Sequence, residues 1–337
     1  MHNSLIKYYQ AILCIWLAHS HFHFTAKGLA SRASPPVVHR LWEICYLCGL
    51  FTMKRLYILL LLFLGGPMYA GVPIVQPDLG KKTLVAPGYF GPNAFQVPEM
   101  NDGTVYDHLH VEMAGDYFNG RIVPGALDRA VDLNIECHIP LFSDRANLTV
   151  WWPVHEWWDS DAEVAEARRI DPALAGRGHD CGPAYISVDI LLMTERQYRP
   201  SIVMRSVLRT AAEKATFASA RSYDAPGYFF DITAGKNLGP FRVALSTGFL
   251  CWQTDNGRQN DAVMFGALAS CQLPWASLSA QYGGYWGWER DGDFPRTIRA
   301  RVDGGPSQWP VRPFFQYQHG FHDWPFDQFR LGVAFTM

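Results

Sequence analysis

The sequence predicts an all-β protein, a transmembrane antiparallel up-and-down β-barrel of about 12 strands preceded by a signal peptide. Three observations lead to this prediction. Short segments that alternate apolar and polar residues recur from residue 105 to the C-terminus. The connections between them alternate between short and long. Aromatic residues gather near the segment ends, where membrane barrels carry interfacial girdles.

The composition is that of a folded chain with little water-facing surface. Of the 337 residues, 49% are hydrophobic and only 18% are charged. Such a chain is too apolar to be disordered and too poor in charge for a typical soluble protein. Six of the 29 basic residues and one of the 31 acidic residues precede residue 71. The rest of the chain therefore has a formal net charge of −7. Nucleic acid requires a basic stripe, and we therefore expect no nucleic-acid partner.

The stretch MKRLYILLLLFLGGPMYAG, residues 53–71, has the order of an export signal. Lys54 and Arg55 precede an apolar run over 56–64, and Gly-Gly-Pro and the small residue Ala70 follow. The run is too short to cross a bilayer as a helix, which takes roughly 20 residues. We predict a cleavable signal peptide over 53–70 and export to the outer membrane of a Gram-negative bacterium.

The residues before this signal, 1–52, show neither a period of 2 nor a period of 3.6. We predict that they are a mis-annotated, disordered leader and that Met53 is the true start. Two alternatives stay open, a membrane helix near residues 5–17 and a metal site. The metal site would use His19, His21, His23 and the Cys45/Cys48 pair, although one CxxC without a second pair is a weak signal.

The residues after the signal, 71–102, are rich in Pro and Gly and have no strand pattern. They form an N-terminal periplasmic or plug segment in this prediction, which plugs the lumen, lies along the periplasmic mouth or stays a mobile arm. The outer-membrane barrel itself is predicted to occupy residues 103–337.

The first two barrel segments, 105–117 and 127–139, each have one apolar and one polar face. In the first, Val111, Met113 and Tyr117 alternate with His110, Glu112 and other polar side chains. The second repeats the pattern. Ten further strands are predicted, at 147–154, 185–193, 202–210, 228–236, 241–253, 262–273, 278–288, 297–303, 311–319 and 329–337.

The connections between these strands segregate by parity. Those after the even strands are short and several contain turn residues, as at 237–240 and 304–310. Those after the third and fifth strands are long, at 155–182 and 211–227. Membrane barrels keep short turns in the periplasm and long loops outside. A soluble β-sandwich also alternates, but it has no need of aromatic collars.

The last segment, FRLGVAFTM, alternates to the end of the chain and resembles the terminal strand of outer-membrane proteins, which the barrel-assembly machinery reads. Met337 departs from the usual terminal Phe. Four stretches, PGYFGPNAFQVPEMNDG, ANLTVWWPVHEWW, DAPGYFFD and FLCWQTDNGRQNDAVMFGA, resemble an uncharacterised family of outer-membrane β-barrel proteins from Bacteroides-like bacteria. The resemblance covers most of residues 85–337. It implies an outer-membrane barrel with no established activity, and residues 1–52 have no counterpart in it.

Polar residues at the inward phase are candidates to line the lumen and bind a solute. A hairpin centred near Ile122 would place His108 opposite Glu136, His110 opposite Asn134 and Glu112 opposite Asp132. Such a set could bind a divalent metal, but a hydrogen-bonded network that fills a narrow barrel is the simpler interpretation. Inward arginines are expected because a lipid-facing Arg costs about 2–4 kcal/mol at the midplane. The lumen-binding candidates are His108, His110, Glu112, Asp132, Asn134, Glu136, His138, Arg205, Arg209, Arg299 and Arg301. Arg242, Arg330, Asp189 and Asp231 share the inward phase.

The function that follows is a channel or binding barrel for a small polar solute, with no cofactor and no metal. Two alternatives are a structural barrel without transport and a lipid-modifying outer-membrane enzyme. An enzyme would use His319 and His322 with Asp323 at the outer rim, but no Ser lies in a GxSxG motif. The expected partners are outer-membrane lipids, the barrel-assembly machinery and the solute.

Two smaller predictions concern the loops and the cysteines. The stretch AEVAEARRI in the loop 155–182 is expected to form one short helix with a solvated acidic face. Cys137, Cys181, Cys251 and Cys271 allow three complete pairings. A turn near Asn256 puts Cys251 opposite residue 261, so we expect no disulfide between Cys251 and Cys271.

Overall fold

The computed structural model describes residues 91–142, 145–168, 171–212, 226–252, 261–288, 293–321 and 323–337. The predicted leader with its alternative helix and metal site, the signal peptide and residues 71–90 lie outside the described residues. His322 and the turn at Asn256 also lie outside them.

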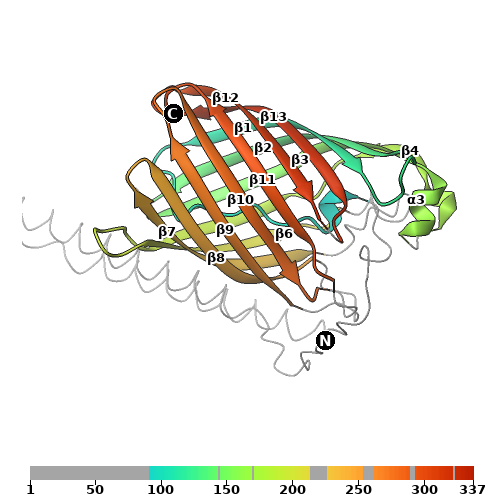
Figure 1. Cartoon of the computed structure of the whole chain (residues 1–337), viewed down its shortest axis with the longest axis horizontal. Helices are drawn as coiled ribbons and strands as arrows, with labels where there is room; N and C mark the ends of the chain where they lie inside the picture. Colours follow the sequence, from blue (N-terminus) through green and yellow to red (C-terminus); the bar gives the residue numbers. More distant parts are fainter. Residues whose placement is uncertain are drawn as a thin grey trace, which may run out of the picture. The chain divides into compact units, whose positions relative to one another are not determined.

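The described residues form a closed antiparallel β-barrel (Figure 1). Of a 13-stranded sheet, 12 strands make the barrel, because β1 (His110–Gly120) pairs with both β2 (Asp128–Leu141) and β13 (Phe326–Thr336), while β2 also pairs with β3 (Ala146–Ser160). The remaining barrel strands are β5 (Tyr185–Met193), β6 (Ser201–Arg209), β7 (Gly227–Leu238), β8 (Phe241–Cys251), β9 (Ala262–Gln272), β10 (Ala276–Trp286), β11 (Arg296–Gly304) and β12 (Val311–Gly320). Each predicted strand overlaps one of these, which confirms the predicted antiparallel β-barrel of 12 strands.

The two rims of the barrel differ in their connections. Strand pairs β2–β3, β7–β8 and β9–β10 are joined at one rim by a few residues each, and His110 of β1 pairs with Thr336 of β13 at the same rim. We call it the short-turn end. Strands β3 and β6 end, and β5 and β7 begin, at the opposite rim, which we call the long-loop end. The longest stretches of sequence between barrel strands, 161–184 and 210–226, separate these strands, so the predicted parity is confirmed. By the usual orientation of such barrels, the short-turn end is periplasmic.

The predicted long loop at 155–182 is wrong in part, because β3 continues to Ser160. The first half of β3 forms backbone hydrogen bonds with β5. Its second half, which extends beyond β5, pairs instead with β4 (Gly176–Asp180). α3 (Ala162–Ala167), the predicted short helix, and η2 (Pro172–Leu174) complete an extension beyond the barrel rim (Figure 1). Val164 of α3 is buried in a small apolar cluster with Ile122 of the β1–β2 connection.

The predicted register of the first hairpin is also wrong. His110 pairs with His138, Glu112 with Glu136 and Asp116 with Asp132. The centre moves from Ile122 to Pro124 because Val123–Ala126 forms the turn, closed by a hydrogen bond of 3.3 Å from Ala126 N–H to the Val123 carbonyl. Pro at the second position and Gly125 at a φ of 87° at the third fit a type II turn.

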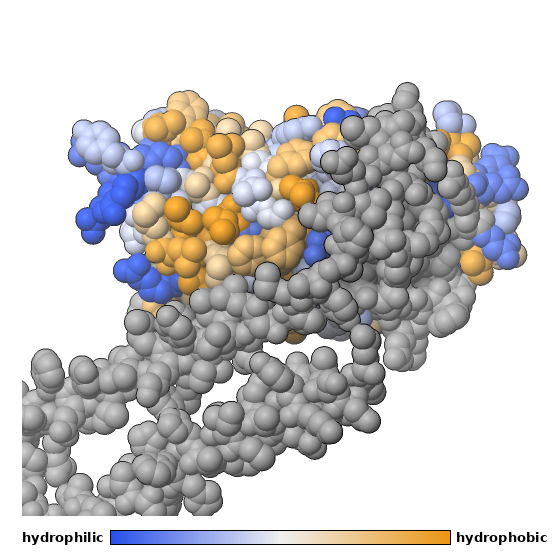
Figure 2. Space-filling model, turned by 90° about the horizontal axis from the view of Figure 1, so that it is seen from below, coloured by the Kyte–Doolittle hydropathy of each residue, from blue (hydrophilic) through white to orange (hydrophobic). Residues whose placement is uncertain are grey.

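Large apolar side chains cover the outside of the barrel. Figure 2 shows hydrophobic residues spread over the barrel wall, with hydrophilic residues gathered toward its two ends. Leu245 is 69% exposed, Leu331 68% and Met113 54%. Side chains of this size and exposure, repeated on strand after strand, suit contact with acyl chains rather than with water. Within the described ranges, the protein has no helix with the length and apolar character needed to cross a bilayer.

None of the cysteines in the described ranges forms a disulfide. Leu250 of β8 pairs with Ala262 of β9, while Phe241 pairs with Cys271 at the other end of the same two strands. Cys251 and Cys271 therefore lie at opposite rims, in agreement with the predicted β8–β9 register.

Candidate functional site

The lumen holds a segment of the chain's own N-terminal part. We call residues 91–107 the strap. It begins with η1 (Pro92–Ala94), and Asn93, Ala94, Phe95 and Val97 are all buried. The strap lies inside because it contacts inward-facing residues on strands around the whole barrel, as the following contacts show.

At the long-loop end, the strap is anchored by both aromatic and polar contacts. Trp324 donates its indole N–H to the Pro92 carbonyl over 3.0 Å, and the Tyr285 hydroxyl donates to the Phe95 carbonyl over 2.6 Å. The Asn93 amide donates to two carboxylates, Asp132 and Glu156, at 2.6 Å each. The main hydrophobic cluster surrounds this end and consists of Ala94, Phe95, Val97, Phe118, Ala130, Tyr185, Val207, Phe229, Leu250, Trp252, Ala262, Met264, Tyr285, Trp288, Trp324 and Phe326.

Along the length of the lumen, arginines from three strands donate to backbone carbonyls of the strap. From β6, Arg209 reaches the Ala94 carbonyl at 3.1 Å and Arg205 the Glu99 carbonyl at 2.7 Å. From β11, Arg299 reaches the carbonyls of Val97 and Pro98, and from β8, Arg242 reaches that of Asp102 at 2.8 Å. Such charge-assisted bonds are about twice as strong as neutral ones. They fix the strap through its backbone.

At the short-turn end, Tyr106 holds the strap against two histidines. Its ring centroid lies 4.5 Å from that of His110 and 4.4 Å from that of His138. The Asn147 amide accepts from the Tyr106 N–H over 2.7 Å and donates to the Tyr106 carbonyl over 2.9 Å. The strap therefore runs from one rim of the barrel to the other.

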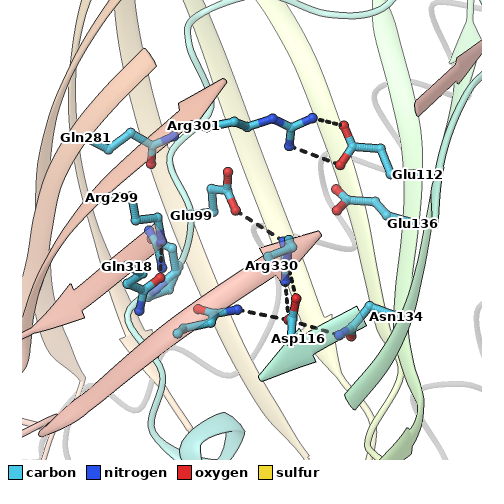
Figure 3. Close-up of polar contacts among 12 residues, drawn as sticks. Glu99, Glu112, Asp116, Asn134, Glu136, Gln281, Arg299, Arg301, Gln318 and Arg330 are labelled. Carbon is cyan, nitrogen blue, oxygen red and sulfur yellow. Dashed lines mark hydrogen bonds and ion pairs between the residues drawn. The ribbon is translucent and has the colours of Figure 1, made fainter. Parts of the chain in front are cut away.

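The wall of the lumen pairs its own charges (Figure 3). Arg330 of β13 lies 2.7 Å from Asp116 of β1, and Arg301 of β11 lies 2.6 Å from Glu112. Arg205 lies 2.6 Å from Asp231 of β7. Each of these pairs joins two different strands of the barrel.

The two lumen histidines each pair with a carboxylate on their own strand. His110 lies 3.2 Å from Glu112, and His138 lies 3.0 Å from Glu136. Across the described ranges, no three His, Cys, Asp or Glu side chains come together in a way that could hold a metal ion. Each histidine also hydrogen-bonds a threonine of a neighbouring strand, His110 with Thr336 and His138 with Thr149.

The predicted lumen candidates face inward, with one exception. His108 precedes β1, is largely exposed and pairs with Asp107 at 2.8 Å, so its placement opposite Glu136 is wrong. The others are buried or partly buried on inward positions of β1, β2, β6 and β11. Sequence reasoning missed Glu99, Gln281, Gln318 and the aromatic anchors, since none of them belongs to a motif.

The histidine predicted for a rim enzyme makes a different contact. His319 Nδ1 lies 2.7 Å from Asp327, and the Tyr317 hydroxyl donates to the same carboxylate over 2.9 Å. Asp323 instead accepts from the Phe294 N–H over 2.7 Å. The predicted grouping of His319 with Asp323 therefore gains no support.

A polar cluster at the short-turn end gives the protein a pH-dependent contact. Burial acts to raise the pKa of Glu195, but bonds from Lys236, the Asn237 N–H and Arg242 outweigh it and lower that pKa. A lowered pKa adds stability above the unfolded value near 4.3, and this is lost as the pH falls through the folded pKa. We expect Glu195→Gln to lower the free energy of unfolding at pH 7. We also expect it to reduce the difference between the free energies of unfolding at pH 7 and at pH 3.5. Urea unfolding at the two pH values measures this, and an unchanged difference would contradict it.

Comparison with known proteins agrees with the architecture. No family model and no curated protein matches the chain. An outer membrane channel from Pseudomonas putida F1 aligns with a TM-score of 0.55 at 11% identity, over 72% of this chain and 100% of the channel. The likeness shows that the two proteins share a fold.

Two further solved structures align more loosely. The NanC porin gives a TM-score of 0.45 at 7% identity, over 67% of this chain and 100% of the porin. Outer membrane phospholipase A from Escherichia coli gives 0.38 at 12% identity, over 75% of this chain and 99% of the phospholipase.

Proposed function

We propose that this protein is an outer-membrane barrel that binds a small polar solute in its lumen and passes it when the strap is displaced. The proposal rests on the composition of the lumen. Many of its inward positions carry charged or amide side chains, such as Asp116, Arg299 and Gln318, and hydrogen bonds that a solute could replace hold the strap inside it. A barrel of purely structural function has no need of a polar lumen that must be satisfied by a separate segment.

Single-channel conductance tests the proposal. The wild-type protein in a planar bilayer is expected to be closed for most of the recording. Phe95→Ala with Tyr106→Ala removes an anchor at each rim and leaves every wall side chain in place, so frequent openings are expected. Tyr282→Ala, which removes an outward-facing aromatic ring, is the matched control and should stay closed.

A folded double variant that never conducts would favour the second candidate function, a structural barrel without transport. A lumen occupied by the strap is also compatible with that function. Folding is checked independently by the difference in migration between the unheated and the heated protein in a denaturing gel. Openings in the double variant alone support a solute pathway.

The route to the membrane belongs to the same proposal. We infer export by the signal at 53–70, lipids around the apolar wall and recognition of the last strand by the barrel-assembly machinery, as in the Bacteroides-like family that the sequence resembles. The N-terminal sequence of the protein purified from its native membrane tests the cleavage, and a chain that retains residues before Met53 would contradict it.

A further inference from the structure

About midway through the lumen, the strap places Glu99 among three arginines of the wall, two of which interact with its carboxylate and one with its backbone carbonyl. Glu99 Oε2 lies 3.6 Å from Arg330 Nη1, and the Glu99 carbonyl accepts from Arg205 over 2.7 Å. Arg299 interacts with Glu99 electrostatically. In Figure 3 the Glu99 side chain points toward Arg330 and lies next to Arg299.

Arg299 differs from the other two arginines in how its charge is compensated. Arg330 forms its ion pair with Asp116, and Arg205 forms one with Asp231. Among the ion pairs of the described residues, none includes Arg299. Its hydrogen bonds go to neutral acceptors, the side-chain carbonyl of Gln318 and the backbone carbonyls of Val97 and Pro98.

The strap therefore supplies most of what stabilises a buried cation. Arg299 is only 6% exposed, and a buried guanidinium needs both hydrogen-bond acceptors and a counter-charge. Two of its acceptors and the nearby carboxylate of Glu99 belong to the strap. When the strap leaves the lumen, Arg299 loses all three and presents a planar fork of donors suited to a carboxylate.

We propose that Arg299, Arg330 and Arg205 form a binding site for the carboxylate of a small organic solute, and that Glu99 occupies this site as a tethered competitor. The inference rests on the proposed function and specifies its solute as a carboxylate. The strap shows the geometry that the solute must copy, with one carboxylate and neighbouring carbonyl oxygens. Because Glu99 is tethered, it competes at a high effective concentration, so solute binds weakly while the strap is seated.

Calorimetry on the purified protein in detergent micelles tests the site. The probe is N-acetyl-glutamate methylamide, which copies Glu99 and its flanking carbonyls, and the neutral control is N-acetyl-glutamine methylamide. Glu99→Gln removes the competing charge at nearly constant shape. We expect this variant to bind the probe at least tenfold more tightly than wild type and to prefer it at least tenfold over the control. Adding Arg299→Gln should abolish both effects.

Equal affinity of wild type and Glu99→Gln for the probe, or equal affinity of Glu99→Gln for probe and control, would overturn the site. If Glu99→Gln does not fold, Glu99→Asp takes its place, since it withdraws the carboxylate by one methylene group. Affinity unchanged from wild type would then overturn the site in the same way.

The binding result separates this inference from the proposed function. Carboxylate binding in a protein whose strap variants never conduct contradicts passage of solute and supports the site. Conductance in the strap variants without carboxylate binding supports the channel and overturns the site.

Discussion

Replacement of Asp116 by Asn is expected to lower the free energy of unfolding by about 3–5 kcal/mol, as for other buried pairs that lose one charge. Asp116 is 3% exposed and accepts from Arg330 through two nitrogens, at 2.7 and 2.9 Å. It also accepts from Gln328 at 2.9 Å and Asn134 at 3.0 Å (Figure 3). The substitution leaves the Arg330 guanidinium buried with its nearest wall counter-charge gone.

Urea unfolding in lipid vesicles, followed by tryptophan fluorescence, measures the change. The matched control is Asp159→Asn, which breaks the pair with Arg177 beyond the barrel rim. Arg177 is 85% exposed there, so the expected loss is about 1 kcal/mol or less. Similar losses in the two variants would mean that water reaches Asp116 and that the lumen is not filled as described.

The strands could be predicted because a barrel wall between lipid and a polar lumen imposes a period of 2 on every strand. In β13, Leu331 faces out and Arg330 faces in, and β8 alternates in the same way with Leu245 and Arg242. Each strand repeats the same two environments, so alternation alone located it. For the same reason, the arginines that were predicted to face the lumen on β6, β8, β11 and β13 do face it.

The hairpin register and the β3–β4 extension depend on information that alternation does not contain. A shift of the hairpin centre by two residues keeps every side chain on its face, so Ile122 and Pro124 fit the pattern equally well. Only the turn chemistry of Pro124 and Gly125 distinguishes them, and it is visible in the sequence. β4 is short and rich in Gly and charged residues, which hides its strand character.

The sequence alone left a lumen plug, a segment along the periplasmic mouth and a mobile arm as alternatives for residues 71–102, because the contacts of the strap are neither local nor periodic. Arg299 reaches the Pro98 carbonyl across 201 positions of the chain, and Trp324 reaches the Pro92 carbonyl across 232. A backbone carbonyl carries no residue signature.

Replacement of Leu245 by Arg is expected to destabilise the folded barrel by about 2–4 kcal/mol in vesicles, because the charge must then lie at the midplane of the bilayer. Leu245 lies at the middle of β8 on its outer face and is 69% exposed, the largest exposure of any Leu, Ile, Val, Phe or Trp in the described ranges. It pairs with Ala234 of β7 and Ala267 of β9, whose small side chains offer Arg no polar partner.

Leu238→Arg is the matched control, since Leu238 ends β7 beside the short turn and is 56% exposed. An Arg near the interface costs about 0–1 kcal/mol, because its long side chain reaches the headgroups. A water-facing exterior would make both substitutions nearly neutral, within about 0.5 kcal/mol. The difference between the two variants, measured by urea unfolding in vesicles of one lipid composition, therefore reports directly on whether acyl chains surround the wall. A difference near zero would remove the physical basis for the polar lumen, the strap that fills it and the carboxylate site at its centre.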